Sequence, residues 1–197
     1  TEDMVSGEAL LGVSVTGWMT RPELFNPDIL QKGADLCKKV NKEVADIIGI
    51  NYAARITTTK PSGNASVILK TASGIHPEHS KRYFRIMQLN KESEIAKYLE
   101  ENMPDLLEES NWSSTKSDYV VFVPVENEDG TLYKDQMIGI KHLELIKLVQ
   151  EHWVVPGTNK DRCYVSTTTH NVSNTVIIDN IEEIKDYIYK NQNIFAA

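Results

Sequence analysis

Short strand-like runs alternate with longer amphipathic helical runs along this chain, and this alternation restricts the possible folds more than any other feature of the sequence. The strand-like runs are residues 10–15, 56–59, 67–69, 119–125 and 171–178. The helical runs are residues 27–48, 92–103 and 141–153, followed by a last helix that carries Ile181, Ile184 and Ile188. We therefore expect an α/β protein with largely parallel strands that alternate with helices.

Local signals mark where two of these helices begin. Asn26 is placed to cap the first helix, Pro27 occupies its first turn and Gly49 follows its last turn. Asp179 and Glu182 have the spacing of a capping box at the start of the last helix.

A glycine-containing loop follows the threonine-rich run at residues 56–59. It reads Lys60, Pro61, Ser62, Gly63, Asn64, Ala65 and Ser66. Small residues, backbone N–H groups and hydroxyls at the end of a strand are what a phosphate-binding loop requires. Ser, Asn and Gly also form tight turns without a ligand, and the loop by itself favours that interpretation. Together with the basic run that follows, however, the loop favours phosphate binding over a simple turn.

That basic run covers residues 74–85 (GIHPEHSKRYFR) and combines histidines, cations and aromatic rings. Its candidate residues are His76, His79, Arg82 and Arg85, and Lys60 lies just upstream. Two histidines without a third ligand make a weak metal site, so we predict no metal and expect structural hydrogen bonds near a ligand pocket. The two arginines and Lys60 either contact phosphate or lie in solvent. The ligand that both motifs suggest is anionic and carries a ring.

Composition excludes some functions. A formal net charge of −7 over 197 residues argues against a general binder of nucleic acid or anionic membranes. No apolar run approaches the roughly 20 residues of a membrane span. Cys37 and Cys163 form no CxxC pair or disulfide framework, so we expect a cytoplasmic protein. The chain begins at Thr1 and stops among apolar residues, from which we expect a fragment or one part of a split protein.

Other conspicuous side chains have structural interpretations. Trp18, Trp112 and Trp153 are predicted to pack in the core, and His142 and His152 to lie on a helix surface. Glu100, Glu101, Asp105, Glu108 and Glu109 are predicted to form a solvated helix face.

Four stretches resemble the catalytic barrel of ribonucleotide reductases, most closely the adenosylcobalamin-dependent (class II) kind. These stretches are residues 10–18 (LLGVSVTGW), 58–66 (TTKPSGNAS), 73–85 (SGIHPEHSKRYFR) and 171–176 (NVSNTV). The phosphate loop and the basic run are specific in combination, whereas the strand at residues 10–18 would be weak alone. The order and spacing of the motifs also resemble the family over nearly the whole chain.

The resemblance implies that residues 1–197 form a single α/β segment, the C-terminal part of a ten-stranded barrel. It implies a reaction in which a cysteine thiyl radical, generated with adenosylcobalamin, abstracts the 3′ hydrogen of a ribonucleotide. By this resemblance the loop from Pro61 to Ser66 holds the substrate phosphates, with Asn64 where many relatives have Thr. Lys60, His76, His79, Arg82 and Arg85 would lie near the cofactor or the substrate.

The chain departs from the family by lacking the radical cysteine and the C-terminal cysteine pair. We therefore expect no catalytic residue in this chain and no activity by itself. The partners implied are a complementary N-terminal reductase part that carries the radical cysteine and a thioredoxin-like reductant. Two alternatives stay open: a stand-alone nucleotide-binding or interaction module, and a reductase fragment with a different radical source.

Overall fold

The computed structural model describes residues 2–196, and the chain divides into two compact units. Unit 2 is the continuous segment His79–Glu128, and unit 1 combines the chain up to Glu78 with the chain from Asp129 onward. Unit 2 is therefore an insertion in the chain of unit 1. We expected residues 1–197 to form a single α/β segment, and that expectation did not include this division.

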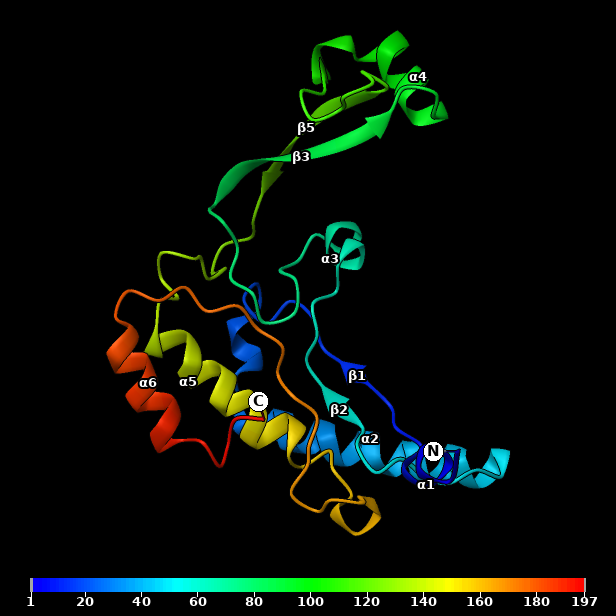
Figure 1. Ribbon diagram of the computed structural model, residues 1–197, viewed down its shortest axis with the longest axis vertical. Helices are drawn as coiled ribbons and strands as arrows, with labels where there is room; N and C mark the ends of the chain where they lie inside the picture. The colour runs from blue at the N-terminus through cyan, green and yellow to red at the C-terminus, as the bar shows by residue number, and fades with distance from the viewer. Residues whose placement is uncertain (1, 197) are drawn as a thin grey trace. The chain divides into compact units, whose positions relative to one another are not determined.

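Unit 1 contains a short parallel sheet and several helices (Figure 1). Its helices are α1 (Glu2–Glu8), α2 (Pro27–Ile48), α3 (Asn64–Leu69), α5 (Ile140–Val149) and α6 (Ile181–Lys190). Its strands are β1 (Val13–Ser14) and β2 (Thr57–Thr58), which pair in parallel with Val13 opposite Thr57. Single parallel bridges join Thr59 to Val172 and Ile138 to Ile177.

The strand-like runs of unit 1 are shorter in the structure than the sequence predicts. Residues 10–15 contribute only β1, and residues 171–178 contribute isolated bridges at Val172 and Ile177 rather than a continuous strand. Residues 67–69 were predicted as strand, but they belong to helix α3. Gly63, with a φ of 53°, turns the chain immediately before α3, so the local backbone overrides the β propensity of Val67 and Ile68.

Helix α2 confirms its predicted ends. The Asn26 side chain accepts hydrogen bonds from the backbone N–H groups of Asp28 (3.0 Å) and Ile29 (3.2 Å). Gly49 follows the last turn in the left-handed region, with a φ of 73°. Helix α6 is capped differently from the prediction, because the side chain of Asn180, rather than that of Asp179, accepts from the N–H groups of Glu182 and Glu183.

The core of unit 1 lies between α2, α5 and the segments around them. Its buried members include Trp18, Met19, Leu30, Ala34, Ala72, Ile75, Leu143, Ile146, Val149 and Trp153. Helix α5 ends earlier than predicted, and a π-helical turn over Gln150–Val154 continues it. The turn carries Trp153, whose indole N–H donates to the carbonyl of Thr58 (2.9 Å) and so joins this core to β2.

Unit 2 contradicts the prediction of a largely parallel sheet. Strands β3 (Arg82–Asn90), β4 (Leu107–Glu109) and β5 (Asp118–Glu126) pair antiparallel in the order β3-β5-β4, and helix α4 (Glu94–Asn102) lies between β3 and β4 in the chain. Only β5 was anticipated among these strands. The fold as a whole is mixed α/β, with one parallel and one antiparallel sheet.

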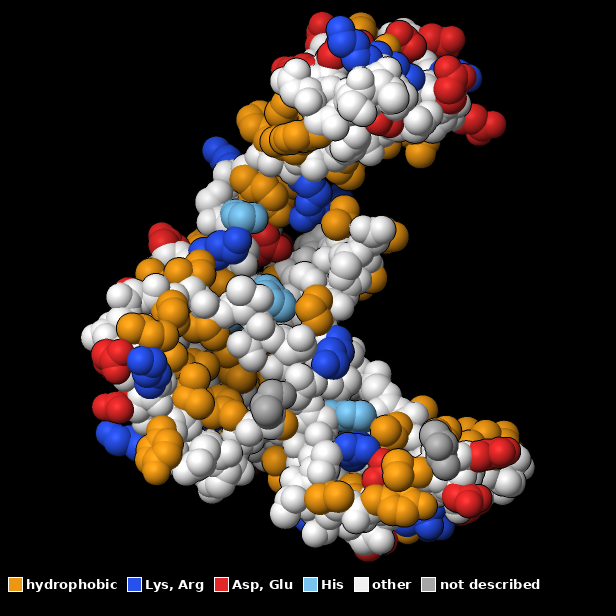
Figure 2. Space-filling model, viewed as in Figure 1, with side chains coloured by type: hydrophobic (Ala, Val, Ile, Leu, Met, Phe, Trp, Pro, Cys, Tyr) orange, Lys and Arg blue, Asp and Glu red, His pale blue; other side chains and the backbone are white. Residues whose placement is uncertain are grey.

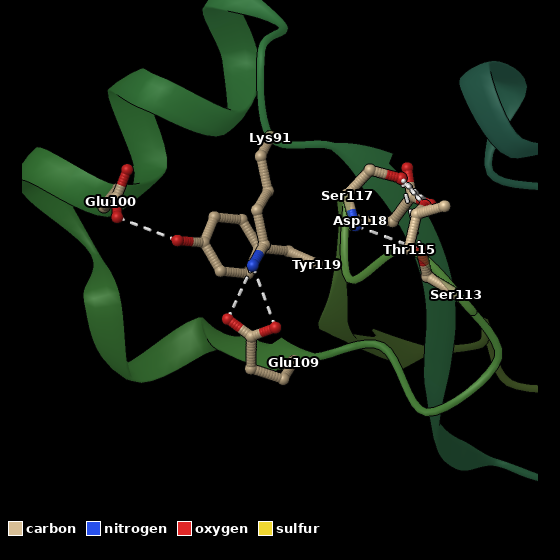
Figure 3. A network of polar contacts seen from close by, with 8 residues as sticks. All are labelled: Lys91, Glu100, Glu109, Ser113, Thr115, Ser117, Asp118 and Tyr119. Atoms are coloured by element: carbon tan, nitrogen blue, oxygen red, sulfur yellow. Dashed lines mark hydrogen bonds and ion pairs between the residues drawn. The ribbon is translucent and has the colours of Figure 1, made fainter.

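Charged and hydroxyl side chains of unit 2 are joined into two polar clusters (Figure 3). Lys91 pairs with Glu109 at 2.6 Å and lies over the ring of Tyr119, whose hydroxyl donates to Glu100 at 2.8 Å. Two of the acidic residues predicted as a solvated helix face therefore have partners, and Glu109 lies on β4 rather than on a helix. Trp112, predicted to pack, is 73% exposed.

The surface of unit 1 carries exposed apolar side chains at the end where α1 and the last turns of α2 lie (Figure 2). Examples are Met4, Val5, Ile47, Ile48 and Ile50. No helix among residues 2–196 combines the length and apolarity that a membrane crossing requires.

Candidate functional site

The predicted phosphate loop connects the carboxyl end of β2 to helix α3. Its surface is formed by Lys60, Pro61, Gly63, Asn64 and Ala65, which are exposed, while Ser62 is half-buried and Ser66 is buried. Because the loop leaves β2 at the end where parallel α/β folds bind ligands, its position suits the predicted role.

Three serine and threonine side chains from other segments hold this loop, two of them through its backbone and one through the Ser62 side chain. The N–H of Lys60 donates to the hydroxyl of Ser14 (2.9 Å), and the N–H of Ser62 donates to the hydroxyl of Ser73 (3.0 Å). The hydroxyls of Ser62 and Thr16 lie 2.8 Å apart in a further hydrogen bond. Sequence reasoning missed this supporting role of Ser14, Thr16 and Ser73, although all three lie inside or next to the quoted motifs.

The loop offers backbone N–H donors to a ligand at two positions. Within the described chain, the backbone N–H groups of Gly63 and Asn64 donate to no protein acceptor. The N–H of Ala65 is occupied by the carbonyl of Ser62 (3.1 Å), and the Ser66 hydroxyl donates to the carbonyl of Gly63 (2.7 Å). Gly63 and Asn64 therefore supply free N–H groups, whereas Ser66 holds the turn in shape.

Lys60 places a positive charge beside the loop. Its Nζ donates to the side-chain oxygen of Asn171 (2.6 Å), which lies next to the bridge between Thr59 and Val172. No carboxylate among residues 2–196 pairs with Lys60, so its charge is available to an anion.

The two histidines of the basic run separate in the structure. His76 belongs to unit 1, where its Nδ1 lies 3.0 Å from the carbonyl of Ser73, the residue that supports Ser62. His79 belongs to unit 2, where its ring lies tilted against the ring of Tyr83 with the two centroids 5.7 Å apart.

The two arginines of the basic run also belong to unit 2, on strand β3 rather than in a loop. Arg82 pairs with Glu126 (2.9 Å), and Arg85 donates to the hydroxyl of Tyr83 (3.0 Å). The structure thus brings Lys60 and His76 into the unit of the phosphate loop and places His79, Arg82 and Arg85 in the other unit.

His142 is not a surface residue as predicted but is fully buried in the first turns of α5. Its Nε2 lies 3.0 Å from the carbonyl of Ile75, and its buried Nδ1 has no hydrogen-bond partner among the described residues. Burial is the main reason that the pKa of His142 is lowered, and nearby His76 lowers it further. The hydrogen bond to the Ile75 carbonyl acts in the opposite direction and raises the pKa in part. His142 therefore supports, as a neutral ring, the segment that carries Ser73 and His76.

The thiols of this chain are poorly suited to chemistry as thiolates. Burial raises the pKa of both Cys37 and Cys163. Among residues 2–196, no three His, Cys, Asp or Glu side chains gather closely enough to hold a metal ion.

A separate cavity of about 910 Å³ lies in unit 1. It is lined by Val155, Lys160, Ser166, Thr167, Thr168, Thr169, His170, Asn171, Gln192, Asn193, Ile194, Phe195 and Ala196. The hydroxyl run at residues 166–169 was its one visible signal in the sequence. The cavity and the phosphate loop are linked through Asn171, which lines the cavity and accepts from Lys60.

Comparison with known proteins gives two matches, and no family model matches the chain. The chain is 24% identical, over 138 residues, to a probable adenosylcobalamin-dependent ribonucleoside-triphosphate reductase of Dictyostelium discoideum, covering 68% of this chain and 17% of that protein. Its fold matches a solved B12-dependent (class II) ribonucleotide reductase with a TM-score of 0.68 and 10% identity, over 100% of this chain and 35% of the other.

Both matches confirm the resemblance to adenosylcobalamin-dependent ribonucleotide reductases that the motifs predict. The chain spans only about a sixth of the Dictyostelium protein and about a third of the solved chain.

Proposed function

We propose that this chain is part of a ribonucleotide reductase, in which it forms the loop that binds the phosphates of the ribonucleotide substrate. The observation that carries the proposal is the pair of exposed, free N–H groups at Gly63 and Asn64 beside the charge of Lys60, which no carboxylate of the described residues neutralises. The sequence and fold matches to class II reductases support it.

In the proposed reaction the chain binds and orients, and another part performs the radical chemistry. Two backbone N–H groups and a hydroxyl can each donate to phosphate oxygens, and hydrogen bonds to a charged acceptor are stronger than neutral ones. Lys60 adds a point charge at the same place. The product of the complete enzyme would be a 2′-deoxyribonucleotide, formed after a cysteine thiyl radical in the complementary part abstracts the 3′ hydrogen of the ribose, with the thioredoxin-like reductant supplying the electrons.

Adenosylcobalamin is the cofactor that we propose for the complete enzyme, where it supplies the radical. The residues of this chain do not by themselves define a site for it. His76 lies in unit 1, whereas His79, Arg82 and Arg85 lie in unit 2 with intramolecular contacts of their own. We therefore assign no cofactor contact to a particular atom here.

The partners that we propose are a complementary N-terminal reductase part and a thioredoxin-like reductant, in the cytoplasm. The large share of each relative that this chain leaves uncovered supports the first partner. The raised thiol pKa values of Cys37 and Cys163 agree with a role in which the reducing cysteines come from elsewhere.

Calorimetric titration with ribonucleoside di- and triphosphates tests the proposed binding. The wild-type chain should bind both, and the Lys60→Met variant should bind roughly tenfold more weakly, because one charge-assisted contact is lost. Lys190→Met removes the same charge from an exposed position on α6 and should leave the affinity unchanged. Equal affinities for wild type and Lys60→Met would contradict the assignment of the loop.

Catalysis is tested by mixing the chain with an N-terminal part of a class II reductase. Reduction should then require both polypeptides and adenosylcobalamin. The alternative of a stand-alone nucleotide-binding module is favoured by one observation, the donors that are already free in the isolated chain. Nucleotide binding that persists without any reduction in the verified complex would support that alternative instead.

A further inference from the structure

Thr16 lies at the centre of the contacts beneath the phosphate loop. Its hydroxyl is 2.8 Å from the Ser62 hydroxyl and 3.0 Å from the carbonyl oxygen of Ala72, and it accepts from the N–H of Gly74 at 2.8 Å. A hydroxyl has one proton to donate and two lone pairs to accept with. The three contacts of Thr16 therefore restrict one another.

The carbonyl oxygen of Ala72 and the N–H of Gly74 each have a fixed role, as acceptor and donor. If Thr16 gives its one proton to Ala72, the hydrogen bond to Ser62 must be donated by Ser62. In that arrangement the Ser62 proton points at Thr16 and is withheld from any ligand. The two lone pairs of Thr16 are then occupied by Gly74 and Ser62.

A second arrangement uses the same atoms without moving the backbone. The carbonyl of Ala72 also accepts from the N–H of Gly17 (2.9 Å), so it keeps a hydrogen bond when Thr16 turns its proton away. Thr16 can then donate to Ser62, and the proton of Ser62 becomes available to an acceptor outside the protein. Because hydroxyl hydrogen bonds polarise one another, the bond from Thr16 strengthens Ser62 as a donor.

We propose that Thr16 is a positioning residue for phosphate binding, and that it switches the Ser62 hydroxyl from an internal to a ligand-facing donor when a phosphate arrives. This inference rests on the proposed function of the loop. The Ser73 hydroxyl, which accepts from the Ser62 N–H at 3.0 Å, holds the Ser62 backbone in place during the switch. Thr16 itself does not contact the phosphate.

The test measures the affinity of the chain for inorganic tripolyphosphate by calorimetry. Thr16→Val removes the hydroxyl and keeps the shape, and it should weaken binding about threefold to tenfold, because Ser62 loses a fixed rotamer and a polarising partner. Thr16→Ser retains the hydroxyl and should restore the wild-type affinity. In a Ser62→Ala background, Thr16→Val should have no further effect, since its action passes through Ser62.

Thr20 offers a matched control in the same segment. Its hydroxyl accepts from the buried N–H of Ala72 at 2.9 Å, so Thr20→Val strips one acceptor from a buried amide just as Thr16→Val does for Gly74. Both variants should lose stability in urea unfolding, but only Thr16→Val should lose tripolyphosphate affinity. Equal losses of affinity in the two variants would show general loosening of the segment and overturn the inference.

The outcomes separate this inference from the function on which it rests. The role of Thr16 is overturned if Thr16→Val leaves tripolyphosphate affinity unchanged, or if it weakens binding equally in the wild-type and Ser62→Ala backgrounds. Either result leaves the proposed phosphate loop itself uncontradicted. A wild-type chain that binds neither tripolyphosphate nor nucleotide overturns both. Weakening in Thr16→Val, rescue by Thr16→Ser and no effect in the Ser62→Ala background would together support the switch.

Discussion

Gly74 packs directly against the carbonyl oxygen of Lys60, so closely that a Cβ on Gly74 would lie 2.7 Å from that oxygen. The contact fixes the entrance of the phosphate loop against the segment that carries Ser73 and His76. Gly74 also has a φ of 56°, a conformation that other residues rarely adopt. Both facts require glycine at this position.

Gly74→Ala should therefore destabilise the chain and displace Lys60. We expect a loss of roughly 2–3 kcal/mol in the free energy of unfolding, from left-handed backbone strain of about 1–2 kcal/mol plus the clash with a backbone atom. Urea unfolding measures the loss. Gly49→Ala is the control, because Gly49 has a φ of 73° but open space around its Cβ position. A loss no larger than that of Gly49→Ala would contradict the close contact.

The buried ring of His142 predicts a pH dependence of stability. Burial lowers the pKa of His142 in the folded chain below its ordinary value of about 6.5, so the unfolded chain takes up a proton first as the pH falls. The stabilisation is complete above that ordinary value and is lost as the pH falls toward the lowered pKa.

Unfolding curves at a series of pH values between roughly 7 and 5 would measure this effect. His142→Gln should flatten the dependence of the free energy of unfolding on pH in that range. His152→Gln removes a histidine that is only half-buried and should keep the wild-type slope. The same slope in His142→Gln and in wild type would show that another group controls stability in this window.

Glu8 predicts a second loss of stability at lower pH. Its carboxylate accepts from the N–H of Tyr164 (2.9 Å) and pairs with Arg55, and these contacts lower the pKa of Glu8. The stabilisation is present above the unfolded value of about 4.3 and disappears as the pH falls through the lowered pKa.

Glu8→Gln should cost roughly 2 kcal/mol at neutral pH, because it leaves the poorly exposed Arg55 without its counter-charge, and it should remove this acid-sensitive step. Glu182→Gln breaks the largely exposed pair with Lys185 and should change stability by about 0–1 kcal/mol. Comparable losses in the two variants would contradict the role of the Glu8 pair.

Features that depend on neighbours in the chain were predictable from the sequence. The ends of α2 follow from Asn26, Pro27 and Gly49, and β5 follows from its run of β-branched and aromatic residues. The loop at residues 60–66 could be selected as a candidate site for the same reason, because its small residues and hydroxyls are contiguous.

Features that depend on distant contacts were not predictable. The antiparallel pairing of β3 with β5 joins residues that are far apart in the chain, and a period of two residues does not reveal the direction of the partner. His142 is buried because Ile75, 67 residues away, offers it a carbonyl. Thr16 and Ser73 escaped notice because their partner, Ser62, lies on another segment.

Trp153 provides the last prediction, because it connects the core of unit 1 to the strand that leads into the phosphate loop. Its side chain is 5% exposed, and its N–H donates to the carbonyl of Thr58 in β2. Trp153→Phe removes this donor and leaves a buried carbonyl short of a partner, so stability should fall by about 1–3 kcal/mol. Trp112→Phe alters an exposed ring and should change stability by less than about 0.5 kcal/mol. Of the two variants, only Trp153→Phe should lose affinity for tripolyphosphate, because β2 holds Lys60 in position. Unchanged affinity alongside the loss of stability would show that the loop keeps its shape without the hydrogen bond from Trp153.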